Sequence, residues 1–297
     1  MTALASEPST STIAPPSPAL VKARLGVVSF INTLPLIDGL ENLASVELRH
    51  SVPSLLLEQL LAGETDIALC SSIDFQQSPE PLLILPVGLL GCDGPTLTVR
   101  LYSSRPLDQI TRVFCDTDSH TSIALLRILL KEAHGIEPQL VDYDAREHVA
   151  ANRPLEWPEA MLLIGDKVVT DSPPAVRYPY QLDLGAEWTT LTGLPFVFAL
   201  WLAREQADPA LLRRAAMALD HQRRHNRERI DVIIHRRARP RHWPVDLAAD
   251  YLKRHIAYEW NDARLQGLEL FYDKAKAHGL IAERRPLRFF EWSARRA

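Results

Sequence analysis

The feature of this sequence that most constrains its fold is an alternation of strand and helix patterns near its start. Apolar, β-branched runs at 23–30, 45–52 and 65–73 predict strands, and a leucine-rich segment at 52–64 predicts a helix between two of them. Alternation of this kind favours a mainly parallel sheet with helices packed on its faces. In such sheets ligands bind outside the carboxyl ends of the strands, so polar residues at those ends are candidate ligand contacts.

The same pattern continues through the middle of the chain and then changes. Runs at 112–118 and 159–169 predict further strands, and 119–135 is the clearest helix pattern, with leucines on one face and Gly135 at its end. From about residue 205 onward the pattern is one of amphipathic helices. We therefore predict an α/β fold of two lobes, closed by a helical carboxyl-terminal third.

Domain boundaries follow from composition and from the points where the strand patterns could pass between lobes. The Ser-, Thr- and Pro-rich segment 1–22 predicts a disordered tail. We expect the chain to cross between lobes near 100–104 and 198–204. The predicted division is a first lobe of 23–103 plus 201–297 and a second lobe of 104–200.

Composition argues against several classes of protein. Hydrophobic residues make up 46% and charged residues 24% of the 297 residues, as in ordinary globular proteins. The net charge of -4 argues against a nucleic acid as the main partner. No run of about 18 apolar residues is present to span a membrane, and the amino terminus lacks the basic start and apolar core of a secretory signal. We expect a cytoplasmic protein whose partner is a small molecule, with neither nucleic acid nor membrane as a partner.

The cysteines constrain the compartment and the chemistry. Cys70, Cys92 and Cys115 are odd in number, widely spaced and outside any CxxC motif. This pattern is typical of a reducing compartment with free, mostly buried thiols, and it argues against a structural zinc site. The sequence also lacks HExxH, GxSxG and glycine-rich phosphate-loop motifs.

The strongest local signal for a ligand is DTDSHTS at 116–122, where a predicted strand leads into a helix. Ser119, Thr121 and Ser122 place three hydroxyl groups at the helix start, beside the free N–H groups that can bind an anion. Ordinary capping of a helix needs only one such residue. From these residues alone, capping and ligand binding carry about equal weight.

Other polar positions at predicted strand ends are weak signals when taken singly. Asn32 and Thr33 follow the first strand, and Ser71–Ser72 end the third. An ordinary turn would explain each of them. His120 is a single histidine, and the arginine-rich stretch 223–241 is typical of a solvated helix face.

Several segments taken together resemble one enzyme family. They are VSFINTLPL, GETDIALCSSIDF, GCDGPTLTVRLYSS, SHTSIALLRILL, EAMLLIGDKVV, YQLDLGAEWTTLTGLPFVFALW and YLKRHIAYEWNDARLQGLELFYDKAKAHGLI. In this order and spacing, over residues 24–282, they are similar to the chorismate dehydratases of the futalosine route to menaquinone. The resemblance implies a type II periplasmic-binding-protein-like fold with a ligand cleft between two α/β lobes. It also implies a hydro-lyase that converts chorismate to 3-[(1-carboxyvinyl)oxy]benzoate and water, without a metal or organic cofactor.

The resemblance also implies site residues, carried over one position at a time. The family's asparagine after the first strand falls on Asn32. Its serine shortly after DGP falls on Thr98, which keeps a hydroxyl group and adds a methyl group. We predict these two residues to be catalytic. The predicted substrate-binding residues are Thr33, Ser71, Ser72, Asp93, Gly94, Ser119, His120, Thr121, Ser122, Gly165 and Asp166.

The implied chemistry suits these residue types. Chorismate is a dianion at neutral pH, which favours amide donors, hydroxyl groups and a helix start. Dehydration removes the proton from the ring carbon that bears the ether and the hydroxyl group from its neighbour, and formation of the aromatic ring drives the reaction. No carboxylate or histidine stands out as a base. We therefore expect the protein to orient the substrate, whose own side-chain carboxylate takes the proton.

Three alternatives stay open at this point. A non-catalytic anion-binding protein could share the fold, although such proteins are expected to carry a signal sequence. The sister enzyme 1,4-dihydroxy-6-naphthoate synthase would be expected to use a catalytic histidine, for which only His120 stands at the matching helix start. A ligand-sensing regulator would be expected to carry a DNA-binding module, which the sequence patterns do not indicate.

Overall fold

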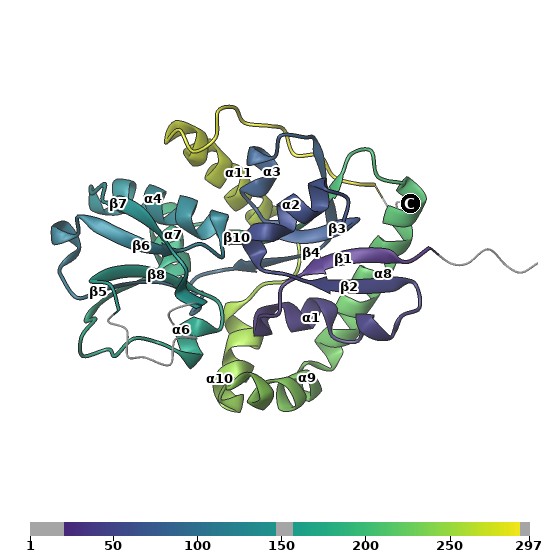
Figure 1. Ribbon diagram of the computed structural model, residues 1–297, viewed down its shortest axis with the longest axis horizontal. Helices are drawn as coiled ribbons and strands as arrows, with labels where there is room; N and C mark the ends of the chain where they lie inside the picture. Colours follow the sequence, from purple (N-terminus) through teal and green to yellow (C-terminus); the bar gives the residue numbers. More distant parts are fainter. Residues whose placement is uncertain (1–20, 147–156, 292–297) are drawn as a thin grey trace, which may run out of the picture.

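The computed structural model describes residues 21–146 and 157–291, which form two five-stranded sheets with helices packed against them (Figure 1). The order of strands in the first sheet is β2 (Val46–His50), β1 (Ala23–Val27), β3 (Ile67–Ser71), β10 (Phe196–Arg204) and β4 (Leu82–Cys92). The order in the second sheet is β7 (Gln139–Tyr143), β6 (Arg112–Asp116), β8 (Ala160–Ile164), β5 (Val99–Ser103) and β9 (Tyr180–Asp183). We call the first sheet with its helices the first lobe, and the second sheet with its helices the second lobe.

The three strands at the start of the chain form as predicted. β1 pairs in parallel with both β2 and β3, whereas β10 runs antiparallel to β3 and β4. Successive residues of β3 enter opposite cores, with Ile67 and Leu69 on one side of the sheet and Ala68 and Cys70 on the other. Because helices cover both faces of the sheet, both sets are apolar, and the strand has no polar face.

Two sets of helices cover the first sheet. One core contains side chains of α1 (Leu34–Ile37), α8 (Pro209–Glu228) and α9 (Ile230–Arg237). The other contains side chains of α2 (Leu56–Leu61), α3 (Asp74–Gln77) and α11 (Asp262–Ala277). Between α9 and α11 the chain forms α10 (Val245–Asp250), which continues as a π-helical turn at Tyr251–His255. α8, α9, α10 and α11 are the helices that the sequence predicts after residue 205.

The second lobe has the same layered construction. β6 pairs in parallel with β7 and β8, and β5 runs antiparallel to β8 and β9. α4 (His120–His134) packs against α7 (Leu184–Thr192), and the short α6 (Lys167–Thr170) follows β8. The predicted helix at 119–135 is confirmed: Ser119 caps its start, and Gly135 ends it at φ +67°.

The strands change sheet earlier along the chain than the sequence predicts. β5 was expected in the first lobe, but it hydrogen-bonds to β8 and β9 of the second, because the turn after Cys92 ends β4 and redirects the chain. β10 joins the first sheet from Phe196 onward, although residues up to 200 were expected in the second lobe. The crossings thus lie at 93–98 and 193–195. The predicted tail at 1–22 lies almost wholly outside the described residues.

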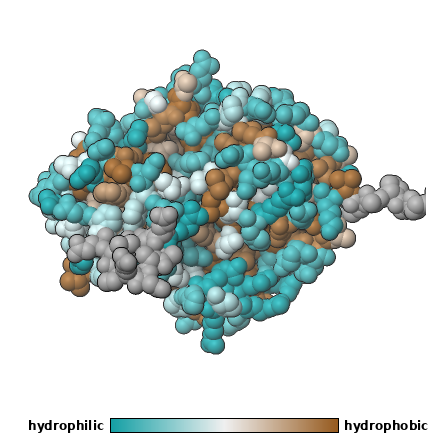
Figure 2. All heavy atoms as spheres, viewed as in Figure 1, coloured by the Kyte–Doolittle hydropathy of each residue, from teal (hydrophilic) through white to brown (hydrophobic). Residues whose placement is uncertain are grey.

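Two predictions about surface and interior are confirmed. Cys70, Cys92 and Cys115 are free and buried. Arg224 and Arg227 are exposed and form ion pairs with Asp220 and Glu259, which fits a solvated helix face, whereas Arg223 in the same stretch is largely buried. The lower edge of the molecule, where α9 and α10 lie, shows mainly hydrophilic side chains (Figure 2). No helix in the described part of the chain combines the length and apolarity needed to cross a membrane.

Candidate active site

A cavity of about 70 Å³ lies between the two lobes, beside the carboxyl ends of β1 and β3. Its polar lining consists of Asn32, Ser71, Thr96, Thr98, Ser119 and Ser122. Apolar residues of both lobes, including Phe30, Ile164 and Phe198, form much of the remaining wall. Of the predicted site residues, the structure brings together here Asn32, Ser71, Thr98, Ser119, Ser122 and Gly165.

Asn32 lies in the single helical turn Ile31–Thr33 that follows β1. Its side-chain oxygen Oδ1 is buried, and none of the described residues forms a hydrogen bond with it. Leaving a buried polar group unpaired costs about 1–3 kcal/mol, so such groups are uncommon in folded proteins. An unpaired oxygen in the wall of a cavity is therefore well suited to accept a hydrogen bond from a ligand.

Thr98 reaches the cavity from a turn with unusual backbone geometry. The preceding residue, Leu97, has φ +64°, a left-handed conformation that is uncommon for a branched side chain. The Asp183 carboxylate accepts hydrogen bonds from the N–H groups of Thr96 at 2.8 Å and Leu97 at 2.7 Å. It thereby holds the turn in place. The Thr98 side chain is buried, and its Oγ1 lies 2.6 Å from the hydroxyl oxygen of Tyr251.

The first turn of α4 adds two hydroxyl groups to the cavity wall. Ser119 Oγ accepts a hydrogen bond from the Ser122 N–H group at 3.2 Å, so it caps the helix, and it lies 2.9 Å from Ser122 Oγ. Both residues also line the cavity. Ser119 thus both caps the helix and forms part of the cavity wall. The partial positive charge of a helix start favours an anionic group at this position.

Three other predicted substrate-binding residues join the two lobes instead of lining the cavity. Thr121 Oγ1 accepts a hydrogen bond from the Ile73 N–H group at 3.0 Å and lies 3.2 Å from Ser72 Oγ. His120 Nδ1 lies 2.8 Å from Asp74 Oδ1, and this hydrogen bond raises the pKa of His120. The hydroxyl-rich motifs thus supply contacts between lobes as well as a cavity wall.

Thr33, Asp93 and Gly94 also lie outside the lining of the cavity. The Thr33 hydroxyl donates to two carbonyl groups of its own turn, so it stabilises the backbone that carries Asn32. Asp93 forms an ion pair with Arg264 at 2.6 Å. The expectation that these residues bind substrate came from their position at a strand end or turn, where backbone contacts require the same residue types.

Gly165 and Asp166 bring the second lobe against the turn that follows β1. Gly165 has φ +70°, and a Cβ atom there would lie 2.8 Å from the Phe30 ring, so glycine alone permits this approach. The Asp166 carboxylate accepts a hydrogen bond from the Ile31 N–H group, at 3.1 and 3.2 Å from its two oxygens. Burial raises the pKa of Asp166 to about 6, opposed by this hydrogen bond and by the charge of Arg241. Asp166 therefore acts as a contact between lobes.

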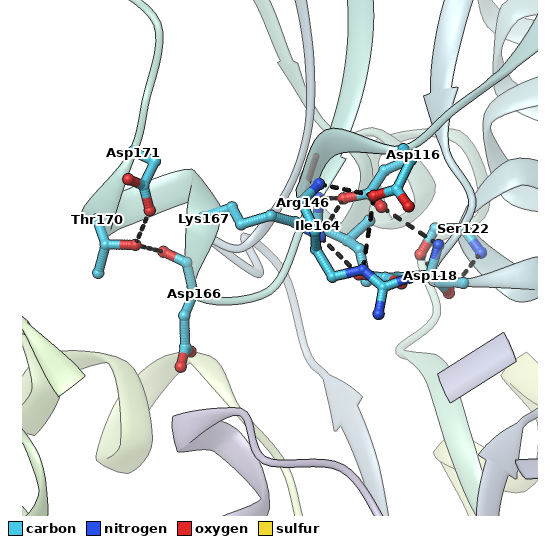
Figure 3. A network of polar contacts seen from close by, with 11 residues as sticks. Asp116, Asp118, Ser122, Arg146, Ile164, Asp166, Lys167, Thr170 and Asp171 are labelled. Atoms are coloured by element: carbon cyan, nitrogen blue, oxygen red, sulfur yellow. Dashed lines mark hydrogen bonds and ion pairs between the residues drawn. The ribbon is translucent and has the colours of Figure 1, made fainter. Parts of the chain in front are cut away.

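A buried group of charges lies in the second lobe, before the start of α4 (Figure 3). Lys167 Nζ lies 2.8 Å from Asp116 Oδ2 and 2.6 Å from Asp118 Oδ2, and Arg146 pairs with Asp118 Oδ1 at 3.2 Å. Burial raises the pKa of Asp116, while Lys167 opposes the rise. In Figure 3 Lys167 points toward both aspartates and Asp166 points away from them. Lys167 bridges the two buried carboxylates and Arg146 joins Asp118 to Asp144, so this group fixes the loop that leads into α4.

A larger cavity of about 500 Å³ shares Val28 and Phe30 with the first. His50 and Arg146 contribute to its lining. The two cavities are therefore neighbours, and the wall of the larger one contains Arg146 together with its ion-pair partner Asp118. Within residues 21–146 and 157–291 the structure has no cluster of three or more His, Cys, Asp or Glu side chains that could hold a metal ion.

The sequence analysis missed two residues that shape the site, Tyr251 and Asp183. Tyr251 begins a segment that was assigned only to a helix, and it lies 153 positions from its partner Thr98. Asp183 follows a strand pattern and precedes a helix, so capping would have been its only signal. Helical and strand periodicity identify a buried face, but they do not identify which distant residue that face meets.

Comparison with known proteins shows which family this chain belongs to. The model of a family described as menaquinone biosynthesis matches residues 23–277. A chorismate dehydratase from Thermus thermophilus is 32% identical over 229 residues, which cover 72% of this chain and 81% of that protein.

Solved structures agree on the fold. Protein AF1704 from Archaeoglobus fulgidus has a TM-score of 0.65 at 16% identity, covering 88% of this chain and 98% of that one. The CA3427 gene product of Candida albicans, described as having the generic periplasmic binding protein fold, has a TM-score of 0.64 at 14% identity, covering 93% and 99%. The predicted two-lobed, periplasmic-binding-protein-like fold is confirmed.

Proposed function

The chain belongs to the menaquinone biosynthesis family, and from that premise we propose that it is a chorismate dehydratase that acts in the futalosine route. In this proposal the substrate is chorismate, and the products are 3-[(1-carboxyvinyl)oxy]benzoate and water. One observation carries the assignment to the cavity between the lobes. Asn32 and Thr98 line the same cavity as the start of α4, and the buried Oδ1 of Asn32 lacks a partner among the described residues.

The reaction needs a bond broken at each of two neighbouring ring carbons. The C–H bond breaks at the carbon that bears the ether, and its electron pair enters the ring. The C–O bond breaks at the neighbouring carbon, and the departing hydroxyl group takes up a proton to leave as water. The new aromatic ring supplies the driving force, so the protein's task is to orient the substrate and to stabilise the leaving group.

The composition of the cavity wall supports the proposal that the substrate's own carboxylate is the base. The described residues that line the cavity include serines, threonines and Asn32, but none of them carries a carboxylate, imidazole or amine. In the proposal the start of α4, with Ser119 and Ser122, holds one carboxylate of chorismate. Asn32 and Thr98 then bind the ring hydroxyl group, with Asn32 as acceptor and Thr98 as donor.

The first test is to incubate the purified protein with chorismate and to follow the ultraviolet spectrum and the product mass. The proposal predicts the loss of one water and an aromatic product. Chorismate that binds without changing would contradict the enzyme and favour an anion-binding protein. The absence of both binding and turnover would favour the sister enzyme, although His120 lies outside the lining of the cavity.

The first variant to test is Asn32→Ala. Removing one positioned hydrogen-bonding group from an active site typically lowers kcat by about 100-fold or more, and we expect a loss of that order here. Asn42→Ala is the matched control, because Asn42 is an exposed asparagine in a short helical turn of the same lobe. Unchanged turnover in Asn32→Ala would remove Asn32 from the mechanism.

A further inference from the structure

Tyr251 is a fully buried residue whose surroundings fix its position closely. It begins the π-helical turn Tyr251–His255, and its ring stacks on Trp243 with a centroid distance of 5.1 Å and an interplanar angle of 18°. Its hydroxyl group extends from the first lobe to Thr98, whose Oγ1 lies 2.6 Å away. Single turns of π-helix often occur at functional sites, where they direct one side chain away from the ordinary helical register.

Either hydroxyl group could donate in this contact, so its direction is part of the inference. Tyr251 and Thr98 each carry one hydroxyl proton, so only one of them can donate to the other. The Asn32 side chain also hydrogen-bonds to Tyr251 and lowers its pKa, as a donor to the phenol oxygen does, whereas Oδ1 of Asn32 receives no hydrogen bond from any described residue. We take Tyr251 as the donor and Thr98 Oγ1 as the acceptor, because a Tyr251 oxygen that accepts from Asn32 still has its own proton to donate. The proton of Thr98 is then left to point into the cavity that Thr98 lines.

We propose that Tyr251 is a positioning residue for the dehydration, which holds the Thr98 hydroxyl group as a donor toward the departing hydroxyl group of the substrate. This inference rests on the proposed function. No bond to Tyr251 is made or broken in the reaction. Thr98 donates to the leaving oxygen while its own oxygen accepts from Tyr251, and each hydrogen bond in such a chain strengthens the other.

Burial keeps Tyr251 in the protonated form that this role requires. Burial raises the pKa of Tyr251 well above its ordinary value, and hydrogen bonding to Thr98 and Asn32 opposes only part of the rise. The hydroxyl group therefore keeps its proton at neutral pH.

The test is Tyr251→Phe in the full chain, measured with chorismate as substrate. We expect kcat to fall about tenfold or more, with KM within about twofold of the wild-type value, because the hydroxyl group acts on the leaving oxygen and not on binding. Tyr272→Phe is the matched control. Tyr272 is also fully buried, and its hydroxyl group donates to the carbonyl oxygen of Ser72 at 2.6 Å, outside the cavity. This control should lose stability and keep kcat.

A double-mutant cycle tests whether Tyr251 acts through Thr98. If it does, Thr98→Ala and Tyr251→Phe together should lower kcat no further than Thr98→Ala alone. Multiplicative losses, or a Tyr251→Phe chain as fast as the wild type, would overturn the inference while wild-type turnover still supports the dehydratase. If Tyr251→Phe does not fold, 3-fluorotyrosine at position 251 retains the hydroxyl group and makes it a stronger donor. A kcat unchanged by that replacement would equally overturn the inference.

Discussion

At Leu97 the backbone adopts a conformation that the residue would not choose in isolation. Its φ of +64° lies in the left-handed region, which costs a branched residue about 1–2 kcal/mol. The hydrogen bonds from Thr96 and Leu97 to Asp183 offset that cost. The result is a turn that delivers Thr98 to the cavity, and strain of this kind is commonly found at functional sites.

The methyl group of Thr98 gives a prediction at the same scale. Thr98→Ser keeps the hydroxyl group that Tyr251 contacts, so we expect kcat for chorismate within about threefold of the wild-type value. Thr98→Ala removes the donor, and we expect kcat to fall about 100-fold. Steady-state kinetics of the two variants would check this. Equal losses in both would mean that the methyl group, and not the hydroxyl group, is what the site requires.

How much of the site could be predicted depended on what each residue contacts. Asn32 follows a strand end and Ser119 begins a helix, whereas only the family resemblance points to Thr98; all three line the cavity, and their roles stay predictions. Thr33 and Thr121 have the same pattern but contact backbone groups. Sequence cannot separate these cases, because a hydroxyl group that holds a turn and one that binds a ligand occupy the same local position.

Among the elements, the junction of β9 and α7 depends most on a single side chain. Asp183 ends β9, and its Oδ1 accepts hydrogen bonds from the N–H groups of Gly185 and Ala186 at 3.1 Å, which begins α7. The same carboxylate holds the turn at Thr96 and Leu97. One residue thus ties the start of a helix to the turn that carries Thr98.

We predict that Asp183→Ala lowers the free energy of unfolding by about 2–4 kcal/mol, since it removes a helix cap and two further charge-assisted hydrogen bonds. Asp208→Ala is the matched control. Asp208 caps α8 through one hydrogen bond, to Ala210, and its loss should cost about 1 kcal/mol. Urea denaturation of both variants would measure the difference. Equal losses would show that the turn at Leu97 does not depend on Asp183.

The predictability of the elements followed their burial. β1, β3 and α4 were predicted because their apolar residues recur at the spacing of a strand or helix that faces a core. The assignment of β5 to a lobe was not predictable in the same way. Its sequence describes a strand but not the neighbours that it pairs with, which lie about 60 and 80 positions further along the chain.

For the molecule as a whole, Asp166 couples the contact between lobes to pH. The pKa of Asp166 in the folded chain is about 6, above its ordinary value of 3.8, and burial is the main cause. Between these values the folded chain keeps a proton that the unfolded chain has lost. The contribution of this group to stability is therefore greatest below about pH 4, falls as the pH rises to about 6, and then stays constant.

Asp166→Asn should remove this dependence, because the amide has no charge to bury and keeps an oxygen that can accept from Ile31. We expect the free energy of unfolding of the variant, taken relative to that of the wild type, to be higher at pH 8 than at pH 4 by up to about 3 kcal/mol. Thermal unfolding at the two pH values would measure it. Asp108→Asn, at an exposed aspartate, is the control and should show no such change. A pH-independent difference for Asp166→Asn would contradict the proposed cause.

The position of β10 between β3 and β4 has a consequence for how the protein is made. β4 ends at Cys92 and β10 begins at Phe196, so the whole second sheet is synthesised between two strands that must become neighbours. At typical rates of translation this interval lasts roughly 5–20 s. During it β3 and β4 each present an unpaired edge, which is where strands of other chains attach. The first sheet thus keeps these edges unpaired until β10 has left the ribosome, and α8, α9 and α11 can cover the sheet only after that.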